Sequence, residues 1–206
     1  MNKNLSLLTI SQVFGFTAAT ITVFLSGIIG SQITSIKSLS TLPTALYVVG
    51  TAIFTILAAR IMSKIGRRLG FIFAALGSSA ASLLAAFAIS QQNFILFCIS
   101  CLILGMGAAF NHQYRFAAAE SVEKEKASRA ISILMLAGVV AAFLGISSAN
   151  YAKNLIPDHV YVGSYLLLVV FTFIPAIFLF FYKNNETTKI EFNNKYNGRR
   201  LFEIIF

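Results

Sequence analysis

The densest group of polar side chains in this sequence is one short run and the glutamate that follows it: Asn111, His112, Gln113, Tyr114, Arg115 and Glu120. Histidine changes its charge near neutral pH, so His112 could carry a proton or, beside Arg115, bind an anionic group. Two structural interpretations compete with this chemistry. A lone histidine often forms a hydrogen bond between helices, and an arginine near the end of an apolar helix often extends its charge to the membrane interface.

Further candidates stand inside the long apolar run near the amino terminus, where Gln12 and Thr17 offer hydrogen-bonding groups. In an apolar helix such groups could line a pathway for a solute. Small and weakly polar side chains also form ordinary packing contacts between helices in lipid, which is the competing interpretation. Glu120 and Lys124 are four residues apart, a spacing that predicts a solvated ion pair along a helix.

Enzymatic chemistry finds no support in the sequence. It contains no H-E-x-x-H, no G-x-S-x-G and no G-x-x-x-x-G-K-[ST] motif, and Asp158 is its only aspartate. Cys98 and Cys101 have no histidine in register with which to form a metal site. We therefore expect a protein that is not an enzyme and that holds neither a metal nor a cofactor.

The composition predicts the elements that position these residues. Of the 206 residues, 57% are hydrophobic and only 11% are charged, whereas a soluble domain has about a quarter charged residues. A membrane-spanning helix needs about 20 mostly apolar residues. Six stretches meet this requirement, at residues 5–30, 42–59, 70–90, 94–114, 130–150 and 160–182. The predicted fold is all-α, a polytopic six-helix bundle over residues 1–182 with a polar tail over 183–206.

The distribution of charge predicts how this bundle is oriented. If the amino terminus is cytoplasmic, every lysine and arginine except Lys37 and Lys153 lies on the cytoplasmic side. The positive-inside rule then places both termini in the cytoplasm of a cell whose plasma membrane, a bacterial inner membrane, holds the protein. The net charge of +9 is thus a topology signal, and nucleic acid is not an expected partner.

Side-chain size predicts which spans face the interior. Small residues recur at helical spacing in the first and fourth spans, and they allow close approach of helix backbones. The sixth span carries many bulky aromatic side chains instead. We expect the first and fourth spans to lie inside the bundle and the sixth to lie mainly against lipid.

The segment between the second and third spans reads ARIMSKIGRRLGF over residues 59–71. It resembles the signature that the major facilitator superfamily carries at the same place, G-x-L-a-D-[RK]-x-G-[RK]-[RK]. Lys64, Gly66, Arg67 and Arg68 match this signature, while Ser63 stands where the family has its aspartate. The run LGMGAA over residues 104–109 resembles the glycine-rich run of the family's fourth helix.

The resemblance implies roles for the residues of this loop. In the family the loop helps to close the cytoplasmic side during alternating access, so we expect a cytoplasmic gate that comprises Arg60, Ser63, Lys64, Gly66, Arg67 and Arg68. Gly66 would provide positive φ in a tight turn, and Ser63 would cap a helix. Without the resemblance, the basic loop is explained by membrane orientation alone.

The resemblance also implies a functional class. It covers nearly the whole chain as the amino-terminal half of a twelve-helix fold, and the tail resembles the start of the linker between halves. We expect a truncated or split half of a secondary transporter for a small solute, with proton coupling through His112 or Glu120 as one option. A second six-helix half or a second copy of the chain would complete it in the lipid bilayer. The alternative is a remnant or accessory subunit that keeps the fold without transporting.

Overall fold

The computed structural model describes residues 2–157 and 159–183 of the chain, so Asp158 and the predicted tail beyond Lys183 lie outside the described residues. Seven α-helices and two short 3-10 helices form within the described residues: α1 Lys3–Ile33, η1 Lys37–Leu39, α2 Leu42–Ile65, α3 Arg67–Ser90, α4 Phe94–Asn111, α5 Tyr114–Glu120, η2 Lys124–Lys126, α6 Ala127–Ala152 and α7 Val162–Phe180. With α5 continuing α4, six helical segments of the described chain are long and apolar enough to cross a membrane. The predicted all-α fold of six spans is confirmed.

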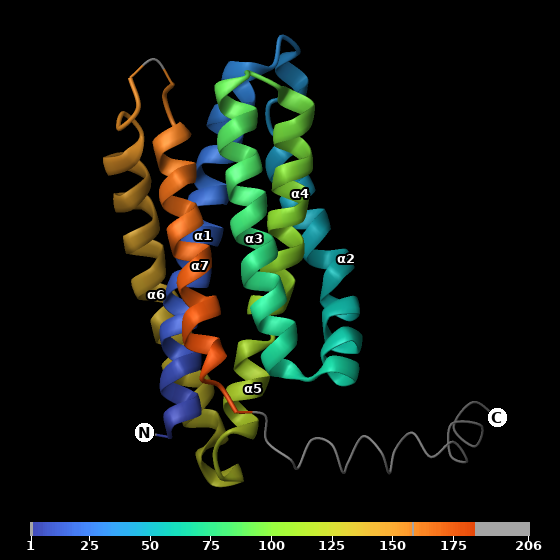
Figure 1. Cartoon of the computed structure of the whole chain (residues 1–206), viewed down its shortest axis with the longest axis vertical. Coiled ribbons are helices and arrows are strands. Elements are labelled where there is room, and N and C mark those ends of the chain that lie inside the picture. The colour runs from blue at the N-terminus through green and yellow to red at the C-terminus, as the bar shows by residue number, and fades with distance from the viewer. Residues whose placement is uncertain (1, 158, 184–206) are drawn as a thin grey trace, which may run out of the picture.

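The helices pack in two units of the same kind. In one unit α1 packs against α6 and α7, and in the other unit α4 packs against α2 and α3. The two units meet where α3 packs against α7 and α1 against α4. The central helices of the two units, α1 and α4, begin at opposite ends of the bundle (Figure 1).

Close backbone contacts hold each unit together. Gly105 of α4 faces the carbonyl oxygen of Tyr47 in α2, and a Cβ at this position would overlap with that oxygen. The hydroxyl of Thr51 donates a hydrogen bond of 3.1 Å to the Gly105 carbonyl. In the other unit, the hydroxyl of Thr17 donates to the carbonyl of Ala141 in α6, at 3.3 Å. These contacts are the small-residue packing that lipid-embedded helices require.

One end of the bundle, here called the basal end, gathers the segments that the sequence analysis singled out. It comprises residues 2–4, 65–68, 114–121 and 180–183, which begin α1, join α2 to α3, form α5 and follow α7 (Figure 1). A buried hydrophobic cluster extends from it into the bundle, with Phe71, Tyr114, Leu134 and Tyr182 among its members. The basal end is therefore a packed surface in which segments far apart in the sequence meet.

Two local expectations differ from the structure. The loop between the second and third spans is a single residue, Gly66, because α2 continues past the apolar stretch to Ile65 and α3 begins at Arg67. Helices extend beyond the hydrocarbon wherever their charged last turns are solvated, so hydropathy alone underestimates their length. The fourth span is interrupted after Asn111, where the backbone N–H of Gln113 bonds the carbonyl of Phe110, three residues back, at 3.0 Å.

The expected lipid-facing helix also differs. The least buried membrane-crossing segments are those of α2 and α6, whereas α7 is buried as extensively as α1. α7 presents Gly163, Ser164 and Thr172 to its neighbours, and Ser164 bonds the Ala149 carbonyl of α6 at 2.8 Å. The many bulky aromatic residues of α7 led to the expectation of lipid exposure, although one face of the helix carries small residues.

Candidate functional site

The connection between α2 and α3 depends on one glycine. Gly66 lies between the last residue of α2 and the first residue of α3, with φ 86° and ψ 156°. Residues with a Cβ rarely adopt this combination. Its positive φ, which the sequence analysis predicted, is confirmed. The turn is what directs the two arginines that follow it along the basal end toward α5 and α7.

Arg67 forms the central ion pair of the basal end. Its guanidinium binds the carboxylate of Glu120 at the end of α5 through two parallel contacts: Nε donates to Oε2 at 2.9 Å, and an Nη donates to Oε1. Such bidentate pairing fixes the orientation of both groups. Glu120 therefore contacts the turn between α2 and α3, a partner that the spacing of Glu120 and Lys124 did not predict.

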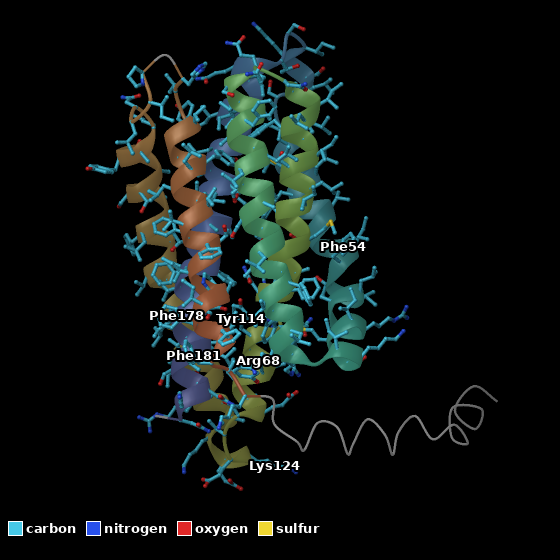
Figure 2. All side chains as sticks on the ribbon, viewed as in Figure 1. Phe54, Arg68, Tyr114, Lys124, Phe178 and Phe181 are labelled. Carbon is cyan, nitrogen blue, oxygen red and sulfur yellow. The ribbon has the colours of Figure 1, made fainter. Side chains whose placement is uncertain are left out.

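Arg68 lies on the other side of the same turn. Its guanidinium carbon lies 4.9 Å from the centre of the Phe180 ring, at the last residue of α7, within the range of a cation–π contact. Figure 2 shows Arg68 and Tyr114 at the basal end, with Lys124 beyond them on the segment after α5. The two consecutive arginines thus bind two different helix ends.

An aromatic cluster supports this ion pair from the interior. The rings of Phe71 and Tyr114 meet edge to face with centroids 4.7 Å apart, and Tyr182 packs on Phe71 at 6.3 Å. Tyr182 is only 2% exposed, and this burial raises the pKa of its hydroxyl to about 12. The charge of Arg67 lowers this pKa and that of Glu120 raises it, both less strongly than burial. The ring contact with Phe71 makes the first residues after α7 part of the same assembly.

Two asparagines at the start of α1 complete the basal end. The amide of Asn2 donates to the carbonyl of Ser121, which ends α5, at 2.6 Å. The amide of Asn4 forms two hydrogen bonds with the backbone of Lys183: its Nδ2 donates to the carbonyl at 2.9 Å, and its Oδ1 accepts from the N–H at 3.3 Å. The sequence analysis missed Asn2, Asn4 and Tyr182, since nothing in their local pattern indicates partners more than a hundred residues away.

The remaining residues of the predicted gate stand apart from these contacts. Arg60, Ser63 and Lys64 lie in the exposed last turns of α2. The hydroxyl of Ser63 donates to the carbonyl of Arg60 at 2.7 Å, so it does not cap a helix as expected. The cap position belongs to Gly66, because α2 is longer than its apolar stretch.

An inner cavity of about 20 Å³ lies among α1, α2, α3, α4 and α7, and a volume of this size admits about one water molecule. Small and hydrogen-bonding residues line it: Gly15, Ala18, Ala19, Thr22, Tyr47, Ser78, Leu104, Ala108, Asn111 and Thr172. The amide of Asn111 covers Gly15, where a Cβ would come within 2.7 Å of Nδ2. Of the predicted pathway residues, Asn111 is the one that reaches this cavity.

The other predicted pathway residues are distributed over several environments. The ring of His112 meets that of Phe16 edge to face, 5.6 Å apart, which joins the helix break to α1. Arg115 is exposed, with its guanidinium over the ring of Phe116 at 5.0 Å. Gln12 is buried on α1, and its side-chain oxygen has no hydrogen-bond partner within the described chain. Thr17 is taken up by the contact with α6 described above.

Comparison with known proteins defines the class to which this arrangement belongs. The family model of the major facilitator superfamily matches residues 5–203. The chain therefore belongs to this superfamily of membrane transporters, and with its six spans it is a multi-pass membrane protein.

Curated relatives add detail. The chain is 34% identical over 203 residues to a protein of Brucella anthropi described as riboflavin transporter RfnT, covering 98% of this chain and 51% of that protein. It is 31% identical over 152 residues to the uncharacterized MFS-type transporter YdeG of Bacillus subtilis, covering 72% of this chain and 34% of that protein. The chain thus spans about half the length, or less, of these curated relatives.

Proposed function

We propose that this chain forms the amino-terminal six-helix half of a secondary transporter that moves a small solute by alternating access. Family membership supports this assignment, and the single observation that carries it is the bidentate contact between Arg67 and Glu120 at the basal end. A gate must hold one end closed and still open on each transport cycle. An ion pair of this partly exposed kind contributes about 1 kcal/mol, which is strong enough to bias the closed form and weak enough to break.

The proposed orientation places the basal end in the cytoplasm of a cell with the protein in its inner membrane. The distribution of basic residues supports it. The turn between α2 and α3, which Arg60, Lys64, Arg67 and Arg68 flank, lies at the same end as the amino terminus, whereas the connection from α1 to α2, which holds Lys37, lies at the opposite end (Figure 1). The test uses single cysteines in intact cells. An impermeant maleimide should label Lys37→Cys from outside and leave Lys64→Cys unlabelled until the membrane is permeabilised, and the reverse pattern would contradict the orientation.

A second six-helix unit is the proposed partner, either a separate chain or a second copy of this one. The exposed apolar faces of α2 and α6 support this proposal, since these least buried helices flank α1 and α4. Residues such as Ile53 and Ile56 on α2 and Leu136 and Phe143 on α6 would meet the partner. Cross-linking of Ile53→Cys or Leu136→Cys in the membrane should yield a specific dimer if the partner is a second copy.

The proposed solute is riboflavin or a similar planar heterocycle, because the relative from Brucella anthropi is described as a riboflavin transporter. Cells that lack their own riboflavin uptake should accumulate labelled riboflavin when they express this chain together with its second half. The Glu120→Gln variant, which breaks the ion pair with Arg67, tests whether this uptake depends on the proposed gate. Uptake equal to that of cells with an empty vector, from well-expressed protein, would favour the alternative of a remnant or accessory subunit.

Proton coupling through His112 is proposed as part of the same mechanism. His112 stands at the break between α4 and α5, where it packs on Phe16 of α1, so a change of its charge would act on both helices. The pH profile of uptake should flatten in His112→Ala. An unchanged profile and rate would assign the coupling to another group or remove it.

A further inference from the structure

The residues that follow α7 are held at the basal end by contacts that no motif explains. Tyr182 inserts its ring beside Phe71 and Tyr114, and the backbone of Lys183 is bound on both its polar groups by Asn4. A side-chain amide that pairs with both backbone groups of one residue replaces the hydrogen bonds of a backbone partner. The chain therefore leaves the bundle at a defined place and in a defined direction.

This exit is joined to the proposed gate by ring contacts. Tyr182 packs on Phe71, four residues after Arg67 in α3, and Phe71 packs on Tyr114 in α5, the helix that ends at Glu120. Asn2, two residues before Asn4, binds the carbonyl of Ser121, the residue after Glu120. The start of α1 thus binds both the end of α5 and the exit from α7, so a displacement of the exit changes the surroundings of the ion pair from two sides.

We propose that Tyr182 and Asn4 are positioning residues for the gate, and that the docked exit of α7 keeps Arg67 and Glu120 aligned. This inference rests on the gate function proposed above. The physical reason is geometric: a bidentate contact between arginine and carboxylate requires both groups in one plane. The ends of α3 and α5 have that orientation only while the Tyr182 ring fills the space beside Phe71 and Tyr114.

The first test measures opening of the basal end in the full chain. Ser121→Cys is a nearly isosteric reporter at a position that is 6% exposed, while the native Cys98 and Cys101 are buried within α4. The rate at which a water-soluble maleimide labels this reporter measures how often the basal end opens. Because Tyr182→Ala removes a buried aromatic contact, it should raise the labelling rate about tenfold, which corresponds to about 1.4 kcal/mol.

The matched controls separate positioning from general loss of structure. Phe181→Ala removes the neighbouring aromatic side chain, which is largely exposed, and should leave the rate unchanged. Tyr182→Phe keeps the ring and should restore most of the protection that Tyr182→Ala loses. If Tyr182→Ala fails to fold, the comparison of Tyr182→Phe with Asn4→Ala carries the test, since neither variant leaves a large cavity.

A double-mutant cycle decides whether Tyr182 acts through the ion pair. Glu120→Gln alone should raise the labelling rate, and adding Tyr182→Ala should raise it little further, because the pair is already broken. If both single variants raise the labelling rate and their effects multiply, Tyr182 acts independently of the ion pair. The positioning role is then wrong, and the proposed gate function of Arg67 and Glu120 is unaffected. If Glu120→Gln alone changes nothing, the gate proposed above is wrong as well.

The second test concerns Asn4 and uses hydrogen exchange of the peptide that contains Lys183. Asn4→Ala removes both hydrogen bonds, so the Lys183 amide should lose its protection. Asn4→Asp keeps an oxygen that accepts from this amide and should retain most of the protection. Equal exchange in the wild-type chain and in Asn4→Ala would show that the exit is not held by Asn4 and would overturn its part in the proposal.

Discussion

Replacement of Gly105 by alanine tests the packing between α2 and α4 most directly. The added Cβ would overlap with the carbonyl oxygen of Tyr47, and it would stand 2.9 Å from the Tyr47 carbonyl carbon and 3.1 Å from the backbone nitrogen of Thr51. All three neighbours are backbone atoms, so no side chain can rotate away and α2 itself must move. Its movement would also lengthen the hydrogen bond from Thr51 to the Gly105 carbonyl.

The expected cost follows from these two effects. Overpacking of a close contact costs about 1–3 kcal/mol, and a hydrogen bond between helices in a membrane contributes about 0.6 kcal/mol. Together they predict that Gly105→Ala lowers the free energy of unfolding by about 2–4 kcal/mol. For a chain of this size, 1 kcal/mol corresponds to about 2–4 °C in Tm, so Tm should fall by roughly 4–16 °C.

The assay uses thiols that the chain already contains. Cys98 and Cys101 are buried on α4, the helix of Gly105, and a fluorogenic maleimide reacts with them only when that helix is released during heating in detergent. Gly77→Ala is the matched control, because a Cβ at Gly77 meets nothing within 4 Å. This variant should keep or raise Tm, since alanine is the better helix former. Equal Tm values for Gly105→Ala and Gly77→Ala would refute the reasoning.

Two further substitutions test the basal end by the same thermal assay. Gly66→Ala should lower the free energy of unfolding by about 1–3 kcal/mol, because φ 86° and ψ 156° are strained for a residue with a Cβ; an unchanged Tm would show that the turn relaxes at no cost. Phe71→Ala should cost about 3–5 kcal/mol, because its ring is fully buried between Tyr114 and Tyr182. Phe73→Ala, which is 64% exposed on the same helix, should change little, and a similar loss in both variants would contradict the assignment of the cluster.

Sequence reasoning was most successful where a single local property decides the structure. Six spans follow from apolar stretches of sufficient length, and the positive φ of Gly66 follows from the need for a tight turn between the second and third spans. It was wrong where a helix is longer or shorter than the apolar stretch that contains it. The charged turns around Ser63 are helical although they leave the apolar stretch, and the break after Asn111 occurs with neither proline nor glycine at the site.

The candidate site shows the same division. Arg67 and Arg68 were predicted as gate residues from the resemblance to the family signature, but their partners were not predicted. Glu120 had a nearer candidate in Lys124, and only the packing of α5 against α6 and α1 brings its carboxylate to Arg67. The contacts of Asn4 with Lys183 span 179 residues, so no window of sequence contains both.

The sequence by itself determined that this protein crosses a membrane six times, which charges gather at one end, and which family signature it carries. These properties depend on composition and short-range spacing, which each segment holds independently of the others. Only the tertiary structure decided that the basal end is one assembly of α1, α3, α5 and the exit from α7. Hydrogen bonds, ion pairs and ring contacts act over a few ångströms, and it is the packing of the helices that brings such distant residues within that range.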